Sequence, residues 1–333
     1  MKTIIYGAGS IGCYIGSLLH KQKVDVCLLG RERIKQLIEQ NDGIRVSDYE
    51  GRDERIADVP FATDPKVLGD ADIVLVTLKC TAIDSAITEL QQYCGKKALI
   101  ICMQNGVGAA EKVKAALPEH QVFTGITPFN VVQTDNAHFR RATDGVLHLP
   151  KLDKLAVLQQ AWNDYGVGCD LEDDIDAIVW GKLLLNLNNA INALSDIPLK
   201  AQLQQRGYRK VLAQCQQELL NLCKAKNYQL AQLTAVNPRW LPHLLRLPDW
   251  LFTRIAQKML AIDPQARSSM WEDVSTGRKT EIDFLNGAVA RLSEAAGLAA
   301  PANKAVSGLI KQIELGELTS GVSAQVLAQR VGV

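Results

Sequence analysis

A lysine and several asparagines recur at helical spacing in the middle of this 333-residue sequence. Lys182, Asn186 and Asn189 stand at i, i+4 and i+7, which places them on one face of a helix. A lysine and amides on a mainly apolar helix need hydrogen-bonding partners if they are buried. A small substrate with a carboxylate and a hydroxyl would supply them, whereas the alternative is an ordinary solvated face. Asparagine is a poor helix former, so the four asparagines in residues 186–192 are also expected to weaken this helix.

A second polar cluster near the C-terminal end has residue types that could complete such a site. Ser269 could bind a carboxylate through its hydroxyl, and Glu281 could orient a lysine ammonium or a ribose. The alternative for Thr280–Glu281 is a helix N-terminus with favourable charge. Both interpretations stay open at this point.

A glycine-rich loop follows a short apolar run at the N-terminus, where Ile4–Tyr6 leads into GAGSIG and then into a helical pattern. In a dinucleotide site, the first glycine makes a tight turn, the second lets the backbone approach a pyrophosphate, and the third lets helix and strand pack closely. The phosphates would lie against N–H groups at the positive end of the helix. A glycine-rich packing turn is the alternative. The predicted cofactor-binding residues here are Gly7, Ala8, Gly9, Ser10, Ile11 and Gly12.

The end of the second predicted strand indicates which cofactor is bound. An NAD-preferring fold usually has Asp or Glu there, about 20 residues past the glycine loop. This chain has Gly30 and Arg31, and a guanidinium pairs with a 2′-phosphate that a carboxylate would repel. Glu32 is close, so NAD stays open, but the sequence favours NADPH. A simply solvated Arg31 is the other alternative.

Two further polar residues follow predicted strands. Lys79 lies just past the strand 73–76, and Asn105 lies just past the strand 98–102. Carboxyl ends of parallel strands are where α/β sheets bind ligands, so both side chains are expected near the nicotinamide half of the cofactor. Taken singly, each would be an ordinary loop residue.

The elements that must position these residues change in kind along the chain. The first part alternates helical segments with short apolar runs, typical of parallel strands covered on both faces. From Asp174 onward, long helical patterns dominate. We therefore expect two domains, 1–172 and 173–333, with a substrate cleft between them. The predicted strands are 4–6, 24–29, 73–76, 98–102, 122–124, 130–134, 138–142, 146–149 and 167–171, and the predicted helices include 152–165, 175–194, 202–226, 251–259, 280–296 and 304–315.

Composition excludes several classes of partner. A net charge of +1 gives no reason to expect nucleic acid or an anionic membrane. The uncharged stretch 3–20 contains too many glycines for a signal peptide or membrane span, so we expect a soluble protein. The eight cysteines are scattered, without a CxxC pair, which suggests buried thiols in a reducing cytosol. The histidines show no ligand spacing, so no metal site is predicted.

The motifs GAGSIG, LKC, QNGVG, WGKLLLN, SSMWED and TEIDFLNG occur in this order, and the set resembles the ketopantoate reductase family over nearly the whole chain. The resemblance implies an α/β fold, with an N-terminal Rossmann-type doubly wound sheet and an all-helical C-terminal domain. It also implies NADPH-dependent reduction of the 2-oxo group of ketopantoate to give pantoate, a pantothenate precursor, in the cytoplasm. A homodimer stays open as the assembly.

The resemblance also implies roles for individual residues. The glycine loop, Arg31, Lys79 and Asn105 match cofactor residues, and Lys182 matches the catalytic lysine. Asn186, Ser269 and Glu281 match further site residues; Asn105 and Lys182 would touch substrate as well, and Glu281 would lie beside the nicotinamide ribose. The remaining site candidate is Asn189 or Asn192, because Ala190 replaces the second asparagine expected eight residues after the lysine. Two alternatives remain: reduction of another branched 2-oxoacid, and a non-catalytic NADPH-binding sensor.

Overall fold

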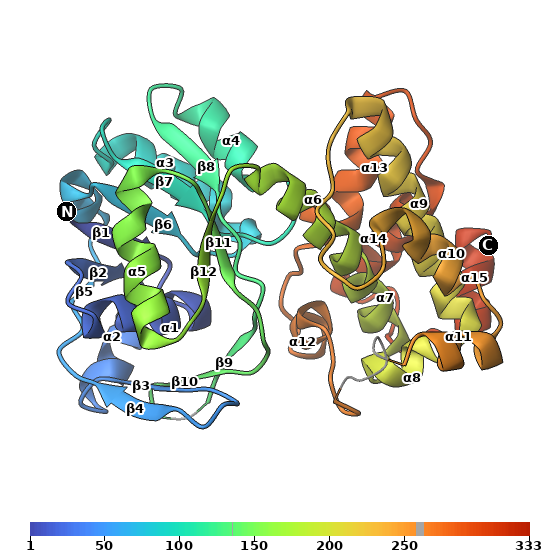
Figure 1. Cartoon of the computed structure of the whole chain (residues 1–333), viewed down its shortest axis with the longest axis horizontal. Coiled ribbons are helices and arrows are strands. Elements are labelled where there is room, and N and C mark those ends of the chain that lie inside the picture. The colour runs from blue at the N-terminus through green and yellow to red at the C-terminus, as the bar shows by residue number, and fades with distance from the viewer. Residues whose placement is uncertain (135, 258–262) are drawn as a thin grey trace. The chain divides into compact units, whose positions relative to one another are not determined.

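The computed structural model describes residues 1–134, 136–257 and 263–333, and the chain divides into two compact units (Figure 1). The first unit runs from Met1 to Ile175 and the second from Asp176 to Val333. The boundary that we propose from the sequence, at residue 172, lies just before this division. The first unit is α/β, and the described residues of the second form helices without strands.

The first unit is organised around a six-stranded parallel sheet with the order β5-β2-β1-β6-β7-β8. Strands β1, β6 and β7 are buried along their whole length, which explains their continuous apolar sequences. This arrangement confirms the doubly wound sheet expected from the sequence. The strands are β1 (Thr3–Tyr6), β2 (Val26–Leu29), β5 (Phe61–Ala62), β6 (Ile73–Val76), β7 (Leu99–Cys102) and β8 (Gln121–Thr124).

The strand order reverses between β1 and β6, which pair in parallel. Tyr6 lies opposite Val76 at the carboxyl ends of these strands, so the loops that follow them leave the sheet at the same edge. Open α/β sheets bind ligands at such a topological switch point. The glycine loop and the loop that contains Lys79 therefore flank this position.

Two smaller sheets complete the first unit: one has the order β4-β3-β10-β9, and the other pairs β11 with β12 in parallel. The strands β3, β4 and β5 are not predicted from the sequence. In β4, three charged residues precede a single buried isoleucine, so no apolar run marks the strand. The strands are β3 (Ile44–Ser47), β4 (Asp53–Ile56), β9 (Val131–Gln133), β10 (His138–Arg141), β11 (Leu147–Pro150) and β12 (Cys169–Glu172).

The first helix of this unit, α1, begins at Ser10, within the glycine loop. It packs against the last, where Trp162 Nε1 donates a buried hydrogen bond of 3.0 Å to the Ile15 carbonyl oxygen. The α-helices of this unit are α1 (Ser10–Lys21), α2 (Glu32–Glu39), α3 (Ile83–Tyr93), α4 (Ala109–Ala116) and α5 (Ala156–Tyr165). This packing fixes the direction in which α1 presents its N-terminus to the switch point.

The second unit is a helical assembly in which the 21-residue α9 contacts α7, α10, α13, α14 and α15. Its α-helices are α6 (Ile175–Asn186), α7 (Asn188–Ser195), α8 (Leu199–Leu203), α9 (Arg206–Lys226), α10 (Leu241–Leu245), α11 (Asp249–Ile255), α12 (Ser269–Ser275), α13 (Asn286–Ala295), α14 (Pro301–Glu314) and α15 (Ala324–Val331). The described part of the chain contains no helix that is both long and apolar enough to cross a membrane.

Two predicted helices are divided in the structure. The prediction of one helix over 175–194 is wrong, because Leu187 separates α6 from α7. The break falls among the four asparagines, where a weakened helix was expected. The prediction of a helix from residue 202 is also wrong, because α8 ends at Leu203 and α9 begins at Arg206.

The predicted helix 280–296 begins later than expected, at Asn286. Thr280 and Glu281 instead precede a short 3₁₀ turn, Ile282–Phe284, so they do not form the first turn of an α-helix. The first part of the predicted helix 251–259 lies in α11, which ends at Ile255. The last residues of the predicted range, including Met259, lie outside the described residues.

Seven of the eight cysteines are buried, and Cys27 is half-buried. Burial raises the pKa of Cys94 to about 11 and that of Cys102 to about 12. These thiols therefore pack as small apolar side chains.

Candidate active site

The glycine loop is held against the loop that follows β6. Gly7 has a φ of +121°, and a Cβ on it would come within 2.6 Å of the Leu78 backbone nitrogen. The Thr77 hydroxyl donates a hydrogen bond of 2.8 Å to the Gly7 carbonyl oxygen. Only glycine therefore fits the turn in this conformation and at this distance from its neighbour.

The other two glycines of the loop meet opposite surroundings. A Cβ on Gly12 would collide with the Gly7 carbonyl oxygen, whereas a Cβ on Gly9 would meet no protein atom within 4 Å. The space beside Gly9 lies at the N-terminus of α1, whose first turn carries no acidic residue. N–H groups in the first turn of a helix lack intrahelical acceptors and attract anions. The loop therefore fits a pyrophosphate; Ala8 is buried in it, and Ser10 and Ile11 are half-buried.

Arg31 lies at the end of β2, next to the glycine loop. A Cβ on Gly30 would come within 2.5 Å of the Ala8 Cβ, so the end of β2 touches the loop directly. Arg31 is exposed and precedes α2, and its neighbour Glu32 accepts a hydrogen bond of 3.4 Å from Gln36 in the same helix. Arg31 directly follows the Gly30 contact with the loop, and a guanidinium is a group that pairs with a 2′-phosphate.

The loops that carry Lys79 and Asn105 are tied to each other. Gln104 is buried, and its Nε2 donates to the carbonyl oxygens of Val76 at 2.9 Å and Leu78 at 3.1 Å. The Cys80 thiol, in return, donates to the Asn105 carbonyl oxygen at 3.3 Å. The structure thus brings together the exposed Lys79 and the half-buried Asn105 at the ends of β6 and β7.

Thr77 and Gln104 join the three loops, but they are not among the site residues predicted from the sequence. Thr77 reaches the glycine loop, and Gln104 reaches the loop after β6. The available signal was a hydroxyl or amide residue one or two positions after a buried strand, where unpaired backbone groups need partners. Its distant partner could not be identified from the sequence.

Lys182 lies in α6 of the second unit, half-buried among apolar residues. Desolvation lowers the pKa of its ammonium to about 8, and the negative charge of Glu281 opposes this shift. The lysine is therefore mainly protonated at pH 7 and can release its proton near neutrality. Asn186 follows one turn later in the same helix.

Glu281 is held by the preceding residue. The backbone nitrogen and hydroxyl of Thr280 both donate to one carboxylate oxygen of Glu314, at 2.7 Å each. Thr280 is buried and Glu281 is half-buried. The Thr280–Glu314 contacts fix the backbone next to Glu281, and the Glu281 charge acts on Lys182.

The four asparagines of this helix pair divide into two kinds. Asn188 Oδ1 accepts from Gln202 Nε2 at 2.7 Å, and Asn192 Nδ2 donates to Gln202 Oε1 at 3.3 Å, so these two amides fix α8. Within the described ranges, the side-chain amides of Asn186 and Asn189 make no hydrogen bond, and both residues are half-buried. The amides open to a ligand are therefore those of Asn186 and Asn189.

The two serines at the start of α12 differ in burial and in role. Ser269 is exposed, whereas Ser268 is buried and caps the helix by accepting from the Trp271 backbone nitrogen at 3.1 Å. Ser268 also binds α7, because its Oγ donates to the Asn189 carbonyl oxygen at 3.1 Å. The predicted substrate residues Asn189 and Ser269 thus lie on neighbouring segments. The sequence signal for Ser268 was its position as a helix N-cap.

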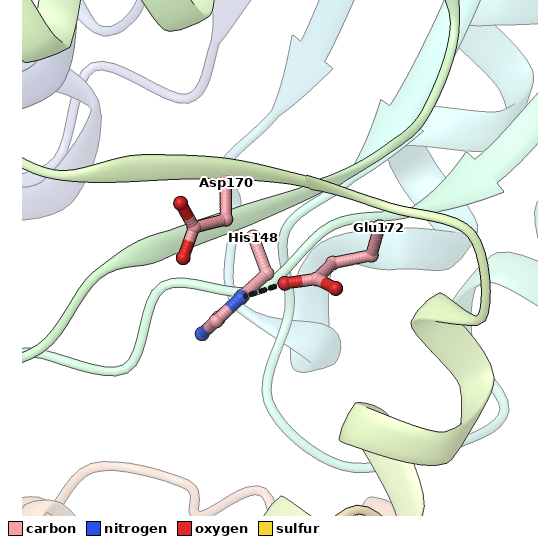
Figure 2. A group of neighbouring side chains, drawn as sticks. All are labelled: His148, Asp170 and Glu172. Atoms are coloured by element: carbon pink, nitrogen blue, oxygen red, sulfur yellow. Dashed lines mark hydrogen bonds and ion pairs between the residues drawn. The ribbon is translucent and has the colours of Figure 1, made fainter.

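One candidate metal group occurs among the described residues, at the pair of strands β11 and β12 (Figure 2). The ligand-type atoms of His148, Asp170 and Glu172 lie within 4.8 Å of one another. His148 Nδ1 and a Glu172 oxygen are 2.7 Å apart, and Asp170 is exposed. Pairing between His148 and Glu172 explains the arrangement, so we assign no metal to it.

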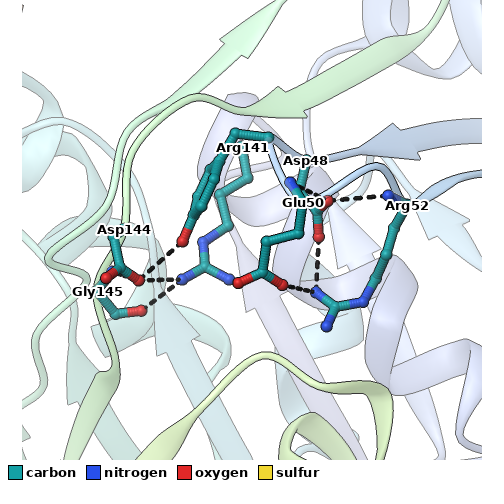
Figure 3. A network of polar contacts seen from close by, with 7 residues as sticks. Asp48, Glu50, Arg52, Arg141, Asp144 and Gly145 are labelled. Carbon is teal, nitrogen blue, oxygen red and sulfur yellow. Dashed lines mark hydrogen bonds and ion pairs between the residues drawn. The ribbon is translucent and has the colours of Figure 1, made fainter. Parts of the chain in front are cut away.

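A second polar network fastens the loop after β3 to the loop after β10 (Figure 3). Arg52 Nη1 donates to Asp48 Oδ2 at 2.7 Å, and the Tyr49 hydroxyl donates to Asp144 Oδ1 at 2.8 Å. The buried Arg141 guanidinium lies 5.5 Å from the Tyr49 ring centroid. These contacts stabilise the four-stranded sheet, to which β3 and β10 belong.

Comparisons with known proteins agree with this architecture. The family model for ketopantoate reductase PanE/ApbA matches residues 3–154, and the model for its C-terminal part matches residues 174–314. Over 317 residues the chain is 25% identical to the 2-dehydropantoate 2-reductase of Halobacterium salinarum, with 93% of this chain and 98% of that protein covered.

Solved structures extend the comparison to three dimensions. A PanE/ApbA family ketopantoate reductase from Ralstonia eutropha JMP134 has a TM-score of 0.79 at 28% identity, covering 95% of this chain and 99% of that one. D-mandelate dehydrogenase, solved with NADH and anilino(oxo)acetate, has a TM-score of 0.75 at 19% identity with the same coverage, a likeness of fold alone. With both parts of the family pattern matched in order, this chain belongs to the ketopantoate reductase family of oxidoreductases.

Proposed function

We propose that the protein reduces 2-dehydropantoate (ketopantoate) to pantoate with NADPH, a step of pantothenate biosynthesis. One observation carries the proposal: Lys182, with a pKa lowered to about 8, is followed on α6 and α7 by the available amides of Asn186 and Asn189. This set combines a proton donor with hydrogen-bonding groups for a polar substrate.

The residues of the first unit fit the parts of NADPH. The glycine loop would hold the pyrophosphate, and Arg31 would pair with the 2′-phosphate. Lys79 and Asn105, at the ends of β6 and β7, would contact the nicotinamide half. Glu32, the carboxylate that would favour NAD, is exposed and accepts a hydrogen bond from Gln36 in the same helix. When bound, NADPH supplies the hydride.

Lys182 performs the proton chemistry in this proposal. Negative charge grows on the carbonyl oxygen of the 2-oxoacid during reduction, and a protonated Nζ stabilises that charge and then donates its proton to the same oxygen. Glu281 keeps the lysine protonated, because its carboxylate opposes the lowering of the pKa. It would also orient the ammonium and lie beside the nicotinamide ribose.

The remaining polar groups match the remaining groups of ketopantoate. The exposed hydroxyl of Ser269 would bind the carboxylate, while Asn186 and Asn189 would bind the distal hydroxyl. Asn105 would touch the substrate as well as the cofactor. Asn192 takes no part, since its amide is fully buried and bound to Gln202 and to the chain.

A second candidate is the reduction of another branched 2-oxoacid. It is favoured by Ala190, a fully buried apolar residue at the position where the second asparagine was expected. A pocket with fewer amides would tolerate a substrate that lacks the distal hydroxyl.

The test is oxidation of NADPH, followed by absorbance, when ketopantoate is added to the purified protein. We expect ketopantoate to exceed its deoxy counterpart, 2-oxo-3,3-dimethylbutanoate, by at least ~10²-fold in kcat/KM, since the deoxy acid leaves the amides unpaired. Asn186→Ala should shrink this gap. Equal values would favour the second candidate, and no oxidation with any 2-oxoacid, despite NADPH binding, would favour an NADPH-binding sensor.

A further inference from the structure

Two buried polar residues of the second unit take no part in the proposed chemistry. Asn192, in α7, is fully buried, and Ser268, directly before α12, is 7% exposed. Asn192 Oδ1 accepts from the Ser268 backbone nitrogen at 2.9 Å, and Ser268 Oγ donates to the Asn189 carbonyl oxygen at 3.1 Å. The start of α12 is thereby tied to the turn of α7 that carries Asn189.

The hydrogen-bonding groups of both side chains are used within the protein. Asn192 Nδ2 donates to the Ile197 carbonyl oxygen at 2.9 Å and to Gln202 Oε1 at 3.3 Å. Ser268 Oγ also accepts from the Trp271 backbone nitrogen at 3.1 Å. Neither side chain has a donor left for a ligand, so their contribution is to geometry.

A more exposed set of contacts fastens the same segment at its outer side. One Asp196 carboxylate oxygen accepts from Trp271 Nε1 at 2.6 Å and from Arg267 Nη1 at 3.2 Å. The Leu199 backbone nitrogen donates to the Ala266 carbonyl oxygen at 2.9 Å. The outer contacts anchor the segment in general, whereas the buried pair alone reaches Asn189.

We propose that Asn192 and Ser268 are positioning residues that hold the Ser269 hydroxyl in register with the Asn189 amide, so that one 2-oxoacid is bound by both. This inference rests on the proposed function. Because residue 190 is alanine, the second amide for the distal hydroxyl, beside Asn186, would be that of Asn189, and the buried pair fixes the turn on which Asn189 lies. Loosening the pair should therefore weaken substrate binding while the proton chemistry of Lys182 continues.

The experiment compares Ser268→Ala with Ser268→Thr, which restores a hydroxyl. Loss of a capping hydrogen bond is expected to raise KM for ketopantoate about tenfold in Ser268→Ala. KM for NADPH and kcat should stay within about twofold of the parent, and Ser268→Thr should recover most of the lost affinity.

A matched control separates positioning from stability. Ser323 caps α15 as Ser268 caps α12, by accepting from a backbone nitrogen, that of Val326, at 3.4 Å. Ser323→Ala should lower Tm without changing KM for ketopantoate. If Ser268→Ala does not fold, Ser268→Gly serves instead, because glycine at an N-cap costs little stability while lacking the hydroxyl.

The outcomes distinguish this inference from the proposed function. A parent enzyme that turns over ketopantoate, with an unchanged KM in the Ser268 variants, would overturn the positioning role alone. A rise in KM that Ser268→Thr fails to reverse would also overturn it. A parent protein that reduces no 2-oxoacid would overturn the proposed function and this inference together.

Discussion

The two units present their candidate residues in different ways. In the first unit, the candidate cofactor site is shaped mainly by backbone: a glycine loop, the N-terminus of α1 and the ends of β1, β6 and β7. In the second unit, the candidate residues for substrate binding and proton transfer are side chains on helices, such as Lys182 and Asn186 on α6. Substitutions in the first unit should therefore act through shape and cofactor selectivity, and those in the second through the chemical step.

The largest expected effect tests the second unit. Lys182→Ala should lose at least ~10²-fold in kcat, the usual contribution of a general acid. NADPH binding should stay near that of the parent. Tm should also stay near that of the parent, because burial of the ammonium already costs folding free energy, as its lowered pKa reflects, and the substitution removes that cost. Steady-state kinetics and cofactor titration measure both. Lys224→Ala, an exposed lysine of α9, is the control, and a Lys182→Ala enzyme with nearly full turnover would contradict the proton-donor role.

The next effect tests selectivity in the first unit. Arg31→Asp removes the partner of the 2′-phosphate and adds repulsion, so NADPH affinity should fall by about ten- to a hundredfold, while NADH affinity changes less. Titration of each reduced cofactor gives the two dissociation constants. Arg33→Asp, in the first turn of α2, makes the same charge change two residues away. An unchanged preference in Arg31→Asp would show that Arg31 is only solvated.

Two glycine substitutions distinguish a glycine that is needed for folding, Gly12, from one that is needed for cofactor binding, Gly9. Gly12→Ala should lower stability by about 1–3 kcal/mol, because its Cβ would meet the Gly7 carbonyl oxygen. Gly9→Ala should leave Tm unchanged but weaken NADPH binding about tenfold, since its Cβ enters the space beside α1 where the pyrophosphate would lie. Thermal melts and cofactor titration give both numbers. Tight NADPH binding by Gly9→Ala would place the pyrophosphate elsewhere.

The smallest effect concerns pH. Reduction needs the protonated form of Lys182, so kcat should fall as pH rises through about 8. The Glu281 carboxylate raises this pKa, so Glu281→Gln should move the falling limb to lower pH. The pH profile of kcat measures the shift, with Glu294→Gln, an exposed carboxylate of α13, as the control. A limb that stays in place would mean that Glu281 does not act on the lysine.

Local sequence was sufficient for much of the first unit. Buried parallel strands produce continuous apolar runs, and the glycine loop has a chemistry that can be inferred from six residues. The strand β4 was missed because Asp53, Glu54 and Arg55 give it the composition of a loop, and its single buried residue is Ile56. Its pairing with β3 depends on a partner outside any local pattern.

The sequence could not predict which polar residues of the second unit bind other parts of the protein and which are available to a ligand. Asn189 and Asn192 look alike in sequence, and the burial of Asn192 depends on Gln202 and on Ser268, which lies 76 residues away. Thr280 and Glu281 match the start of a helix, yet Glu314 binds Thr280 and the helix begins later. Partners that are distant in sequence decide these cases.

The burial of the thiols has a consequence for the behaviour of the protein under oxidising conditions. A thiolate is the species that reacts with peroxides, disulfides and alkylating agents, and the raised pKa of Cys94 and Cys102 leaves almost none of it at neutral pH. Cys102 ends β7, directly before the loop that carries Asn105, so an oxidised sulfur there would disturb the candidate cofactor site. Protonation and burial thus give this edge of the sheet chemical resistance during oxidative stress.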